Sequence, residues 1–368
     1  TVCKKDGSNV NIRLTKMYEY EGLSRVECQQ ASVGDIVLVA GVADVHIGDT
    51  ICAVDCLEPL PFVEIDEPTL SMNFSVNDSP FAGRDGQYVT SRHLRDRLFR
   101  EINTNVSLRV EETDSADCFK VSGRGELHLS ILIETMRRQG YEFQVSKPQV
   151  INKVIDGKVM EPVELLIVDV PEEYVGAVIE KLSERKGQML NMTASSNGFT
   201  RLEFNIPSRS IIGYRAQLLT DTRGNGVMNH VLTGYEEYKG EIETRARGSL
   251  IAFEDGEACS YGLFNSQDRG TLFIGPGTEV YEGMVVGETN RGEDIVVNVC
   301  KKKHVTNTRA AGSDDALRLV TPKDMSLENC IEFLADDELL EITPNYLRIR
   351  KKILDKSLRA KAKSKING

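Results

Sequence analysis

The 368-residue sequence has no tryptophan, and its aromatic content is only 6%. It has no Gly-x-x-x-x-Gly-Lys-[Ser/Thr] motif, the sequence with which P-loop GTPases and ATPases hold nucleotide phosphates. It has no run of about 20 apolar residues long enough to span a bilayer, and it does not open with a basic and then apolar secretion signal. We therefore expect a cytoplasmic protein that does not hydrolyse a nucleotide with these residues alone.

Cysteine and histidine are present, but they are not spaced for metal binding. The eight cysteines include no Cys-x-x-Cys pair, and the five histidines show no ligand spacing. This pattern indicates reduced thiols rather than a zinc site or a disulfide framework. Nothing resembles a nucleophile elbow. We predict no catalytic residue, no metal ligand and no cofactor-binding residue in this chain.

Charge is abundant and unevenly distributed. The net charge is −11, yet residues 301–323 carry six bases against two acids, and residues 347–368 carry nine bases against one acid. An acidic body disfavours general adhesion to polyanions, whereas a basic end can dock on phosphate. A tail that only keeps the protein soluble is the alternative interpretation.

The hydrophobic pattern predicts a multidomain α+β protein with four parts. Residues 1–62 contain short strands broken by glycine turns, typical of a β-barrel. The chain opens inside a predicted strand, and another strand is predicted at Asn11–Met17. We therefore expect a partial barrel that lacks its first strands. Residues 63–149 and residues 150–240 each show the order β-α-β-β-α-β, which is typical of ferredoxin-like domains. In the second of these, Asn197-Gly198 is the hairpin signal.

Residues 241–368 are predicted to form a β-rich C-terminal domain with terminal helices. We expect Cys259–Phe264 to be one of its strands, Ser326 to cap a helix, and Pro344 to open a last basic helix. The polar stretch from residue 301 to residue 323 has no hydrophobic period and is longer than most connections within a domain. Such loops are usually functional or disordered, and we favour function.

Clustered bases and neighbouring polar residues give the candidate RNA-binding residues. They are Lys301, Lys302, Lys303, His304, Asn307 and Arg309 in the polar loop, Arg348, Arg350, Lys351 and Lys352 in the tail, and Arg209, Arg215 and Arg223 in residues 150–240. Clustered cations release counterions from a phosphate backbone and bind it without sequence specificity. Small αβ domains present edges and loops suited to folded RNA. Ordinary surface charge is the alternative for the three arginines.

Several motifs resemble those of translation factors. Ser122-Gly-Arg-Gly-Glu-Leu-His128-Leu resembles the third domain of elongation factor G-like translational GTPases. Val170-Pro-Glu-Glu-Tyr174-Val-Gly, with Arg185-Lys-Gly187, resembles the opening of their fifth domain. Residues 212–224, 268–270, 277–283 and 298–303 resemble the BipA/TypA family within that group.

The resemblance implies that a GTP-binding domain, with its GTP and Mg, precedes these residues in the full-length protein. It implies the 70S ribosome, 23S and 16S rRNA, A-site tRNA and ribosomal proteins as partners of a monomeric protein, without a membrane. By analogy, residues 301–309 would contact tRNA and rRNA. The full-length protein would act at the factor site in translation under stress and in large-subunit assembly. A protein–protein scaffold or a metabolite-sensing module built on paired ferredoxin-like domains remains the alternative.

Overall fold

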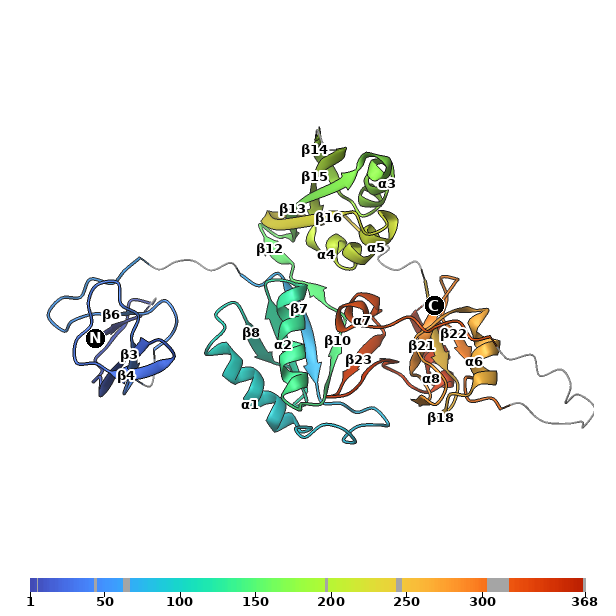
Figure 1. Cartoon of the computed structure of the whole chain (residues 1–368), viewed down its shortest axis with the longest axis horizontal. Helices are drawn as coiled ribbons and strands as arrows, with labels where there is room; N and C mark the ends of the chain where they lie inside the picture. The colour runs from blue at the N-terminus through green and yellow to red at the C-terminus, as the bar shows by residue number, and fades with distance from the viewer. Residues whose placement is uncertain are drawn as a thin grey trace, which may run out of the picture. The chain divides into compact units, whose positions relative to one another are not determined.

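The computed structural model describes residues 1–4, 6–42, 45–61, 67–195, 198–242, 247–302 and 318–366. They divide into two compact units, one of Thr1–Asp66 with Phe99–Ser107 and the other of Glu67–Leu98 with Leu108–Gly368. The described residues form several β-sheets and eight α-helices, and none of these sheets closes into a barrel (Figure 1). Within the same ranges, no helix is both long and apolar enough to cross a membrane.

The first unit contains two three-stranded antiparallel sheets. The first has the order β2 (Asn9–Val10), β1 (Val2–Cys3), β6 (Thr50–Ile51), and the second has the order β4 (Ser24–Glu27), β3 (Lys16–Glu21), β5 (Leu38–Ala40). Gly22, at a φ of 63°, begins the two-residue turn between β3 and β4, as expected for a hairpin turn. The prediction of a strand at Asn11–Met17 is wrong, because β3 begins only at Lys16.

Apart from residues 99–102 at the end of the first helix, which belong to the first unit, the second unit begins with six elements in the order β-α-β-β-α-β. They are β7 (Leu70–Ser75), α1 (Ser91–Ile102), β8 (Arg109–Glu112), β9 (Cys118–Gly123), α2 (Glu126–Arg138) and β10 (Phe143–Ser146). The strands form an antiparallel sheet in the order β10-β7-β9-β8, and β11 (Gln149–Val150) also pairs with β7. The helix α2 buries Leu129, Leu132, Ile133 and Met136, whose spacing puts them on one face.

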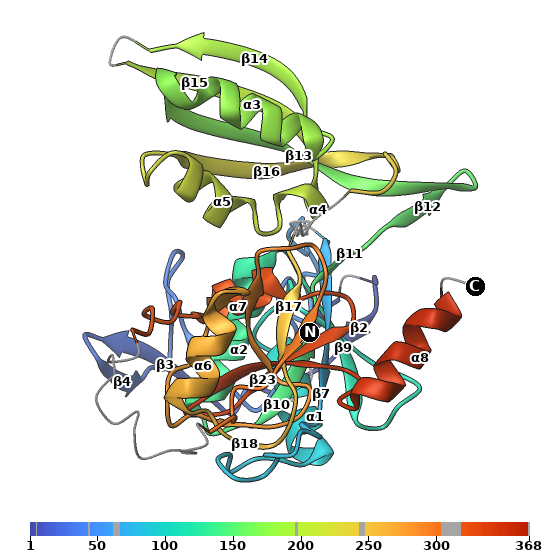
Figure 2. The ribbon, with the colours of Figure 1, turned by 90° about the vertical axis from the view of Figure 1, so that its right-hand side faces the viewer.

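The same order of elements recurs in the following residues. They are β12 (Lys153–Ile155), β13 (Lys158–Pro171), the 3₁₀ turn η1 (Glu172–Tyr174), α3 (Val175–Glu184), β14 (Gln188–Ala194), β15 (Phe199–Pro207), α4 (Ser208–Ile211), α5 (Tyr214–Asp221) and β16 (Val227–Glu237). The sheet order is β16-β13-β15-β14, and β12 extends it. Figure 2 shows α3 lying along this sheet. Val178 of α3, Phe204 of β15 and Leu218 of α5 meet in its core. Asn197 lies outside the described residues.

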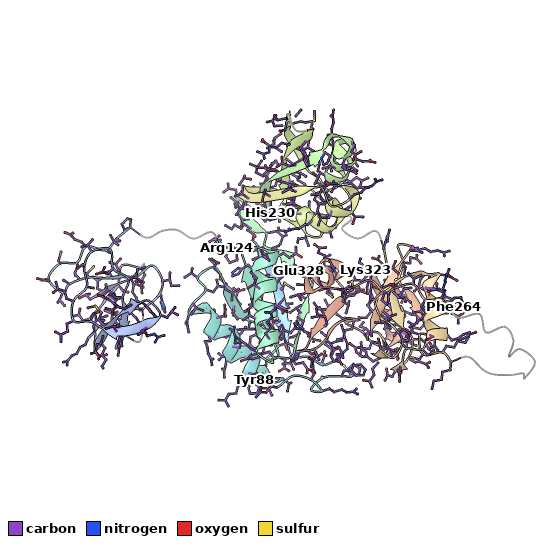
Figure 3. All side chains as sticks on the ribbon, viewed as in Figure 1. Tyr88, Arg124, His230, Phe264, Lys323 and Glu328 are labelled. Atoms are coloured by element: carbon purple, nitrogen blue, oxygen red, sulfur yellow. The ribbon has the colours of Figure 1, made fainter. Side chains whose placement is uncertain are left out.

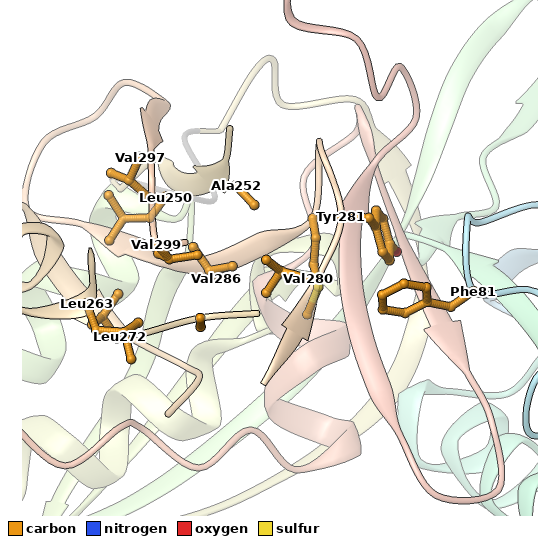
Figure 4. Packing of buried hydrophobic residues seen from close by; sticks show 12 residues of the cluster. Phe81, Leu250, Ala252, Leu263, Leu272, Val280, Tyr281, Val286, Val297 and Val299 are labelled. Carbon is orange, nitrogen blue, oxygen red and sulfur yellow. The ribbon is translucent and has the colours of Figure 1, made fainter. Parts of the chain in front are cut away.

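The C-terminal residues form a further sheet with its own core. Its strands have the order β19 (Gly270–Leu272), β21 (Val285–Thr289), β17 (Ser249–Ala252) and β22 (Ile295–Val297), and β18 (Gly256–Glu257) pairs with β20 (Glu279–Val280). Figure 4 shows the buried cluster that these strands enclose, with Tyr281 packed against Phe81. The two rings meet edge to face, with centroids 5.0 Å apart.

The prediction of a strand at Cys259–Phe264 is wrong, because residues Ser260–Gln267 form the helix α6. A short apolar run cannot be assigned to helix or strand by periodicity alone. The helix makes a close tertiary contact at Gly262, where a Cβ atom would lie only 2.2 Å from the carbonyl oxygen of Val299. Glycine lets α6 pack directly against the backbone that follows β22.

The C-terminal end also differs from the prediction. Ser326 caps α7 (Leu327–Phe333) as expected, with its Oγ accepting a hydrogen bond from the backbone N–H of Asn329. However, the residues directly after Pro344 form a strand and not a helix: β24 (Leu347–Lys351) pairs with β23 (Glu338–Ile342). In turn, β23 pairs with β10 (Figure 1). This hairpin extends the first αβ sheet to the order β24-β23-β10-β7-β9-β8. The final helix, α8, is confined to Lys356–Ile366.

Candidate nucleic-acid interface

The polar loop leaves the C-terminal sheet at the beginning of α6. Val299 is buried, whereas Lys301 and Lys302 are exposed. The backbone N–H of Cys259 donates to the Val299 carbonyl at 3.0 Å, and the Cys259 thiol donates to the Lys301 carbonyl at 2.8 Å. The residue that precedes α6 therefore fixes the backbone from which the two lysine side chains project.

The chain returns at the other end of α6. The Gln267 side chain donates to the Arg318 carbonyl at 3.1 Å and accepts from the backbone N–H of Val320 at 3.1 Å. Leu319 packs against the buried cluster of this sheet. One helix, which the sequence did not predict, thus holds the backbone on both sides of residues 303–317. Lys303, His304, Asn307 and Arg309 lie outside the described residues.

Lys351 is not part of an exposed tail. Its side chain is 2% exposed, and its Nζ lies 2.7 Å from Asp294, 3.0 Å from Asp337 and 3.0 Å from Glu338. Burial opposes the charge on Lys351, but the three carboxylates outweigh it and raise its pKa. Burial likewise disfavours the charge on Asp294, yet its hydrogen bond to Lys351 lowers the pKa of that carboxyl. The strand β24 therefore ends in an internal ion-pair network.

Arg350 and Arg348 also face the protein interior. Arg350, 2% exposed, is paired with Asp78, and it donates to the side chain of Gln144 at 2.5 Å. Arg348 donates to the fully buried Glu341 at 3.2 Å. The prediction that Arg348, Arg350 and Lys351 form an exposed basic surface is therefore wrong, because carboxylates of the protein itself pair with all three inside the fold. Lys352, the fourth tail candidate, is exposed.

Of the three candidate arginines in residues 150–240, one is paired within the protein and two are exposed. Arg209 makes two hydrogen bonds, of 2.5 and 3.2 Å, to the fully buried Glu161, and a third, of 2.6 Å, to the carbonyl of Gly240. Arg209 therefore forms its ion pair and hydrogen bonds within the protein. Arg215, on α5, and Arg223, just after it, are exposed. These two remain as candidates for a surface contact.

The helix α8 supplies exposed bases that the candidate set omitted. Its first turn is capped by Asp355, whose Oδ1 accepts from the backbone N–H of Leu358 at 2.8 Å. Lys356, Lys361 and Lys363 project from this helix and are exposed. The charge count over residues 347–368 contained this signal, but the sequence could not show that the basic residues of β24 turn inward and those of α8 turn outward.

The surroundings of Glu126, at the start of α2, have the opposite charge. Burial, together with Glu332 and Glu328 of α7, raises the pKa of Glu126 to about 7. His230 faces the same carboxyl and forms a 2.5 Å contact with Glu164 that raises the pKa of the histidine. Figure 3 labels His230 and Glu328 in this region. A carboxylate cluster repels phosphate, so the candidate interface does not include it.

The candidate interface of the described residues therefore has three parts. They are Lys301 and Lys302 at the base of the polar loop, Lys352 with Lys356, Lys361 and Lys363 at α8, and Arg215 with Arg223 at α5. These side chains are cationic and exposed, which suits contact with a phosphate backbone. Among the residues that the structure describes, no group of three His, Cys, Asp or Glu side chains is placed to hold a metal ion.

Comparison with known families first defines the class of protein. Residues 158–246, which include β13 to β16, match the family model described as the elongation factor G C-terminus. Residues 247–356, from β17 to the start of α8, match the model of the TypA/BipA C-terminal domain. The chain thus combines a domain of the kind found at the C-terminus of the translation factor elongation factor G with a TypA/BipA C-terminal domain.

Curated relatives agree with this assignment. The chain is 53% identical over 348 residues to a "Large ribosomal subunit assembly factor BipA" from Synechocystis, covering 95% of this chain and 58% of that protein. It is 51% identical over 366 residues to the BipA of Bacillus subtilis, covering 99% and 60%. It is 46% identical over 363 residues to that of Escherichia coli K12, covering 98% and 60%. The chain belongs to the BipA/TypA family, as its motifs predicted, and spans about 58–60% of the length of these relatives.

Proposed function

We propose that this chain is the RNA-binding portion of a BipA-type translational GTPase that acts in assembly of the large ribosomal subunit. The relatives carry the name of a large-subunit assembly factor. The observation that carries the proposal is the anchoring of the polar loop by α6, which presents Lys301 and Lys302 on an exposed, fixed backbone. Its partners are then the ribosome, with 23S and 16S rRNA, ribosomal proteins and A-site tRNA, in the cytoplasm.

The domain organisation fits this proposal. The two sheets have the strand orders β10-β7-β9-β8 and β16-β13-β15-β14. If the four strands of each sheet are numbered in chain order, both sheets read 4-1-3-2. This shared order supports two ferredoxin-like domains, in residues 63–149 and 150–240. We assign residues 1–62 to part of a translation-factor β-barrel, and residues 241–368 to the BipA-specific domain. The first αβ sheet and the BipA-specific domain share strands through β23 and β24.

We assign no GTP- or Mg-binding residue to this chain. The sequence contains no P-loop motif, and phosphate binding in GTPases depends on that loop. We assign nucleotide binding and hydrolysis to the portion of the relatives that this chain does not cover. The described domains would then supply contacts to RNA rather than the hydrolytic chemistry.

The test is co-sedimentation of the 368-residue chain with purified large ribosomal subunits. Replacing Lys301, Lys302 and Lys303 with glutamate reverses three charges at the loop, so we expect the variant to stay in the supernatant at about 0.1 M salt. The matched control carries glutamate in place of Arg92, Arg95 and Arg138, which are exposed bases on α1 and α2. This control should pellet like the wild type. Circular dichroism checks the fold of both variants.

Two outcomes would contradict the proposal. If the loop variant pellets as well as the control, the polar loop does not hold the subunit. If binding of the wild type survives at about 0.5 M salt, where phosphate contacts weaken steeply, the chain binds through protein–protein contacts, as the scaffold alternative requires.

A further inference from the structure

Two cysteine thiols meet in the first unit. Cys3 lies on β1, and Cys52 directly follows β6; their Sγ atoms are 3.8 Å apart. Both side chains belong to free cysteines, Cys3 buried and Cys52 half-buried. A separation of 3.8 Å is van der Waals contact between sulfur atoms, so no other atom lies between them.

The β-ladder holds both backbones in place. β1 is the central strand of its sheet, paired with β2 on one side and β6 on the other, with Cys3 opposite Thr50. The backbone N–H of Cys52 donates to the Thr1 carbonyl at 2.8 Å, which continues the same ladder. Because Cys52 comes two residues after Thr50, its side chain lies on the same face of the sheet as Cys3. The two thiols are diagonal neighbours across an antiparallel pair.

A disulfide requires an S–S distance of about 2.05 Å. The sulfur atoms of this pair must therefore approach by less than about 2 Å, a movement within reach of side-chain rotation when both Cβ atoms share a face. The exposure of the pair is asymmetric, because Cys52 is the more accessible of the two. Burial and the contact with Cys52 raise the pKa of the Cys3 thiol, which makes Cys3 the poorer initial nucleophile.

We propose that Cys3 and Cys52 form a reversible dithiol–disulfide pair that is oxidised by hydroperoxides. The Cys52 thiolate attacks the peroxide oxygen and becomes a sulfenic acid, while the O–O bond breaks and an alcohol (or water, from hydrogen peroxide) leaves with the thiol proton. The Cys3 sulfur then attacks the Cys52 sulfur, forms the S–S bond and expels water. Two thiols and one hydroperoxide thus give one disulfide, one alcohol and one water.

The disulfide would link β1 to the residue that follows β6 and would make residues 3–52 a covalently closed loop. These two strands lie far apart in the first unit's sequence, so the bond would resist their separation. Cys28 and Cys56 lie in the same unit and provide internal controls. The exposed Cys56 is as open to reagents as Cys52 or more so, and it should oxidise without a partner.

The test is mass spectrometry of the full 368-residue chain after hydrogen peroxide treatment and alkylation with N-ethylmaleimide. We expect a cross-linked peptide that joins Cys3 to Cys52, two hydrogens lighter than the reduced pair and released by dithiothreitol. The Cys56→Ser variant should give the same cross-link. In Cys3→Ala, the sulfenic acid on Cys52 should persist and be labelled several-fold more by dimedone than in the wild type.

The wild-type measurement does not depend on how the variants fold. If both cysteines of the treated wild type remain alkylated by N-ethylmaleimide, or if Cys52 is found as a sulfinic acid without a cross-link, the proposal is wrong. A cross-link between Cys52 and Cys56 in place of the expected one would also overturn it. Equal dimedone labelling of Cys52 in the wild type and in Cys3→Ala would show that Cys3 does not resolve the sulfenic acid.

Discussion

The buried ammonium of Lys351 makes the most specific prediction of the structure. Replacing it with methionine keeps most of the length of the side chain and removes the charge that pairs with three carboxylates. Breaking a buried ion pair by removing one partner typically costs about 3–5 kcal/mol, because the remaining charge is buried without compensation. Glu338 keeps hydrogen bonds from Ser249, of 2.6 Å, and from the backbone of Ala335, of 2.8 Å. We therefore expect a loss near the lower end, about 3 kcal/mol.

Differential scanning calorimetry of the whole chain measures this loss. At about 2–4 °C per kcal/mol, the transition that contains β24 should fall by at least about 6 °C at pH 7. The control is Lys352→Met at the neighbouring position, which is exposed and should shift the transition by less than about 1 °C. Adding Glu338→Gln to the Lys351→Met variant should recover part of the loss, because it removes one uncompensated charge.

The pH dependence gives a second measurement of the same network. Lys351 has a raised pKa, so its contribution is complete below its unfolded pKa and is lost only at strongly alkaline pH. Asp294 has a lowered pKa, so its contribution is present at neutral pH and is lost as the pH falls through its folded pKa. The difference between wild type and Lys351→Met should therefore narrow below about pH 4. Equal melting of the Lys351 and Lys352 variants at pH 7 would refute the reasoning.

Three further predictions concern single positions. Gly262→Ala would place a Cβ against the Val299 carbonyl, so we expect a loss of about 1–3 kcal/mol in thermal unfolding; a melting temperature unchanged within 1 °C would contradict the packing of α6. Arg209→Ala leaves Glu161 buried without its partner and should cost about 3–5 kcal/mol in the same assay; a loss below about 1 kcal/mol would mean that the ion pair adds nothing. Glu126 has a raised pKa, so the folded state loses stability as the pH rises from about 4.5 to about 7. The Glu126→Gln variant should therefore have a higher melting temperature than the wild type at pH 8 and the same melting temperature at pH 4. The same difference in melting temperature at both pH values would exclude the titration of Glu126 as its cause.

The controls for these variants use neighbouring positions. Arg215→Ala removes an exposed arginine from the same domain as Arg209 and should change stability by less than about 0.5 kcal/mol. Glu328→Gln, on α7, lowers the charge near Glu126 and should lower the pKa of that carboxyl, because Glu328 is one of the groups that raise it. A pH profile that does not respond to Glu328→Gln would place the titrating group elsewhere.

The elements that the sequence could predict are those whose stability is local. The helix α2 is marked by its apolar spacing from Leu129 to Met136, and α7 by the cap at Ser326. The order of the two αβ units follows from such signals, because amphipathic helices alternate with short apolar strands. A motif match over several segments then identified the family without any knowledge of the fold.

The contacts that the sequence could not predict join residues far apart in the chain. Arg350 and its partner Asp78 are 272 residues apart, and no local pattern marks a carboxylate as the partner of a given base. The sequence alone therefore predicts one exposed basic surface in the tail, although β24 buries its charges and α8 exposes its own. The helix α6 is not predictable from the sequence for a similar reason, since Gly262 indicates a close backbone contact only when the position of Val299 is known.

The most direct test of the RNA-binding proposal is the salt dependence of binding to purified large ribosomal subunits. Between about 50 and 200 mM salt, the logarithm of the binding constant should fall linearly with the logarithm of the salt concentration. Each phosphate contact that a variant loses should make this slope less steep by about 0.7–0.9. Replacing Lys301, Lys302 and Lys361 with alanine removes three such contacts and should therefore make the slope shallower by about 2–3. An unchanged slope in this variant, or wild-type binding that does not depend on salt, would contradict the account.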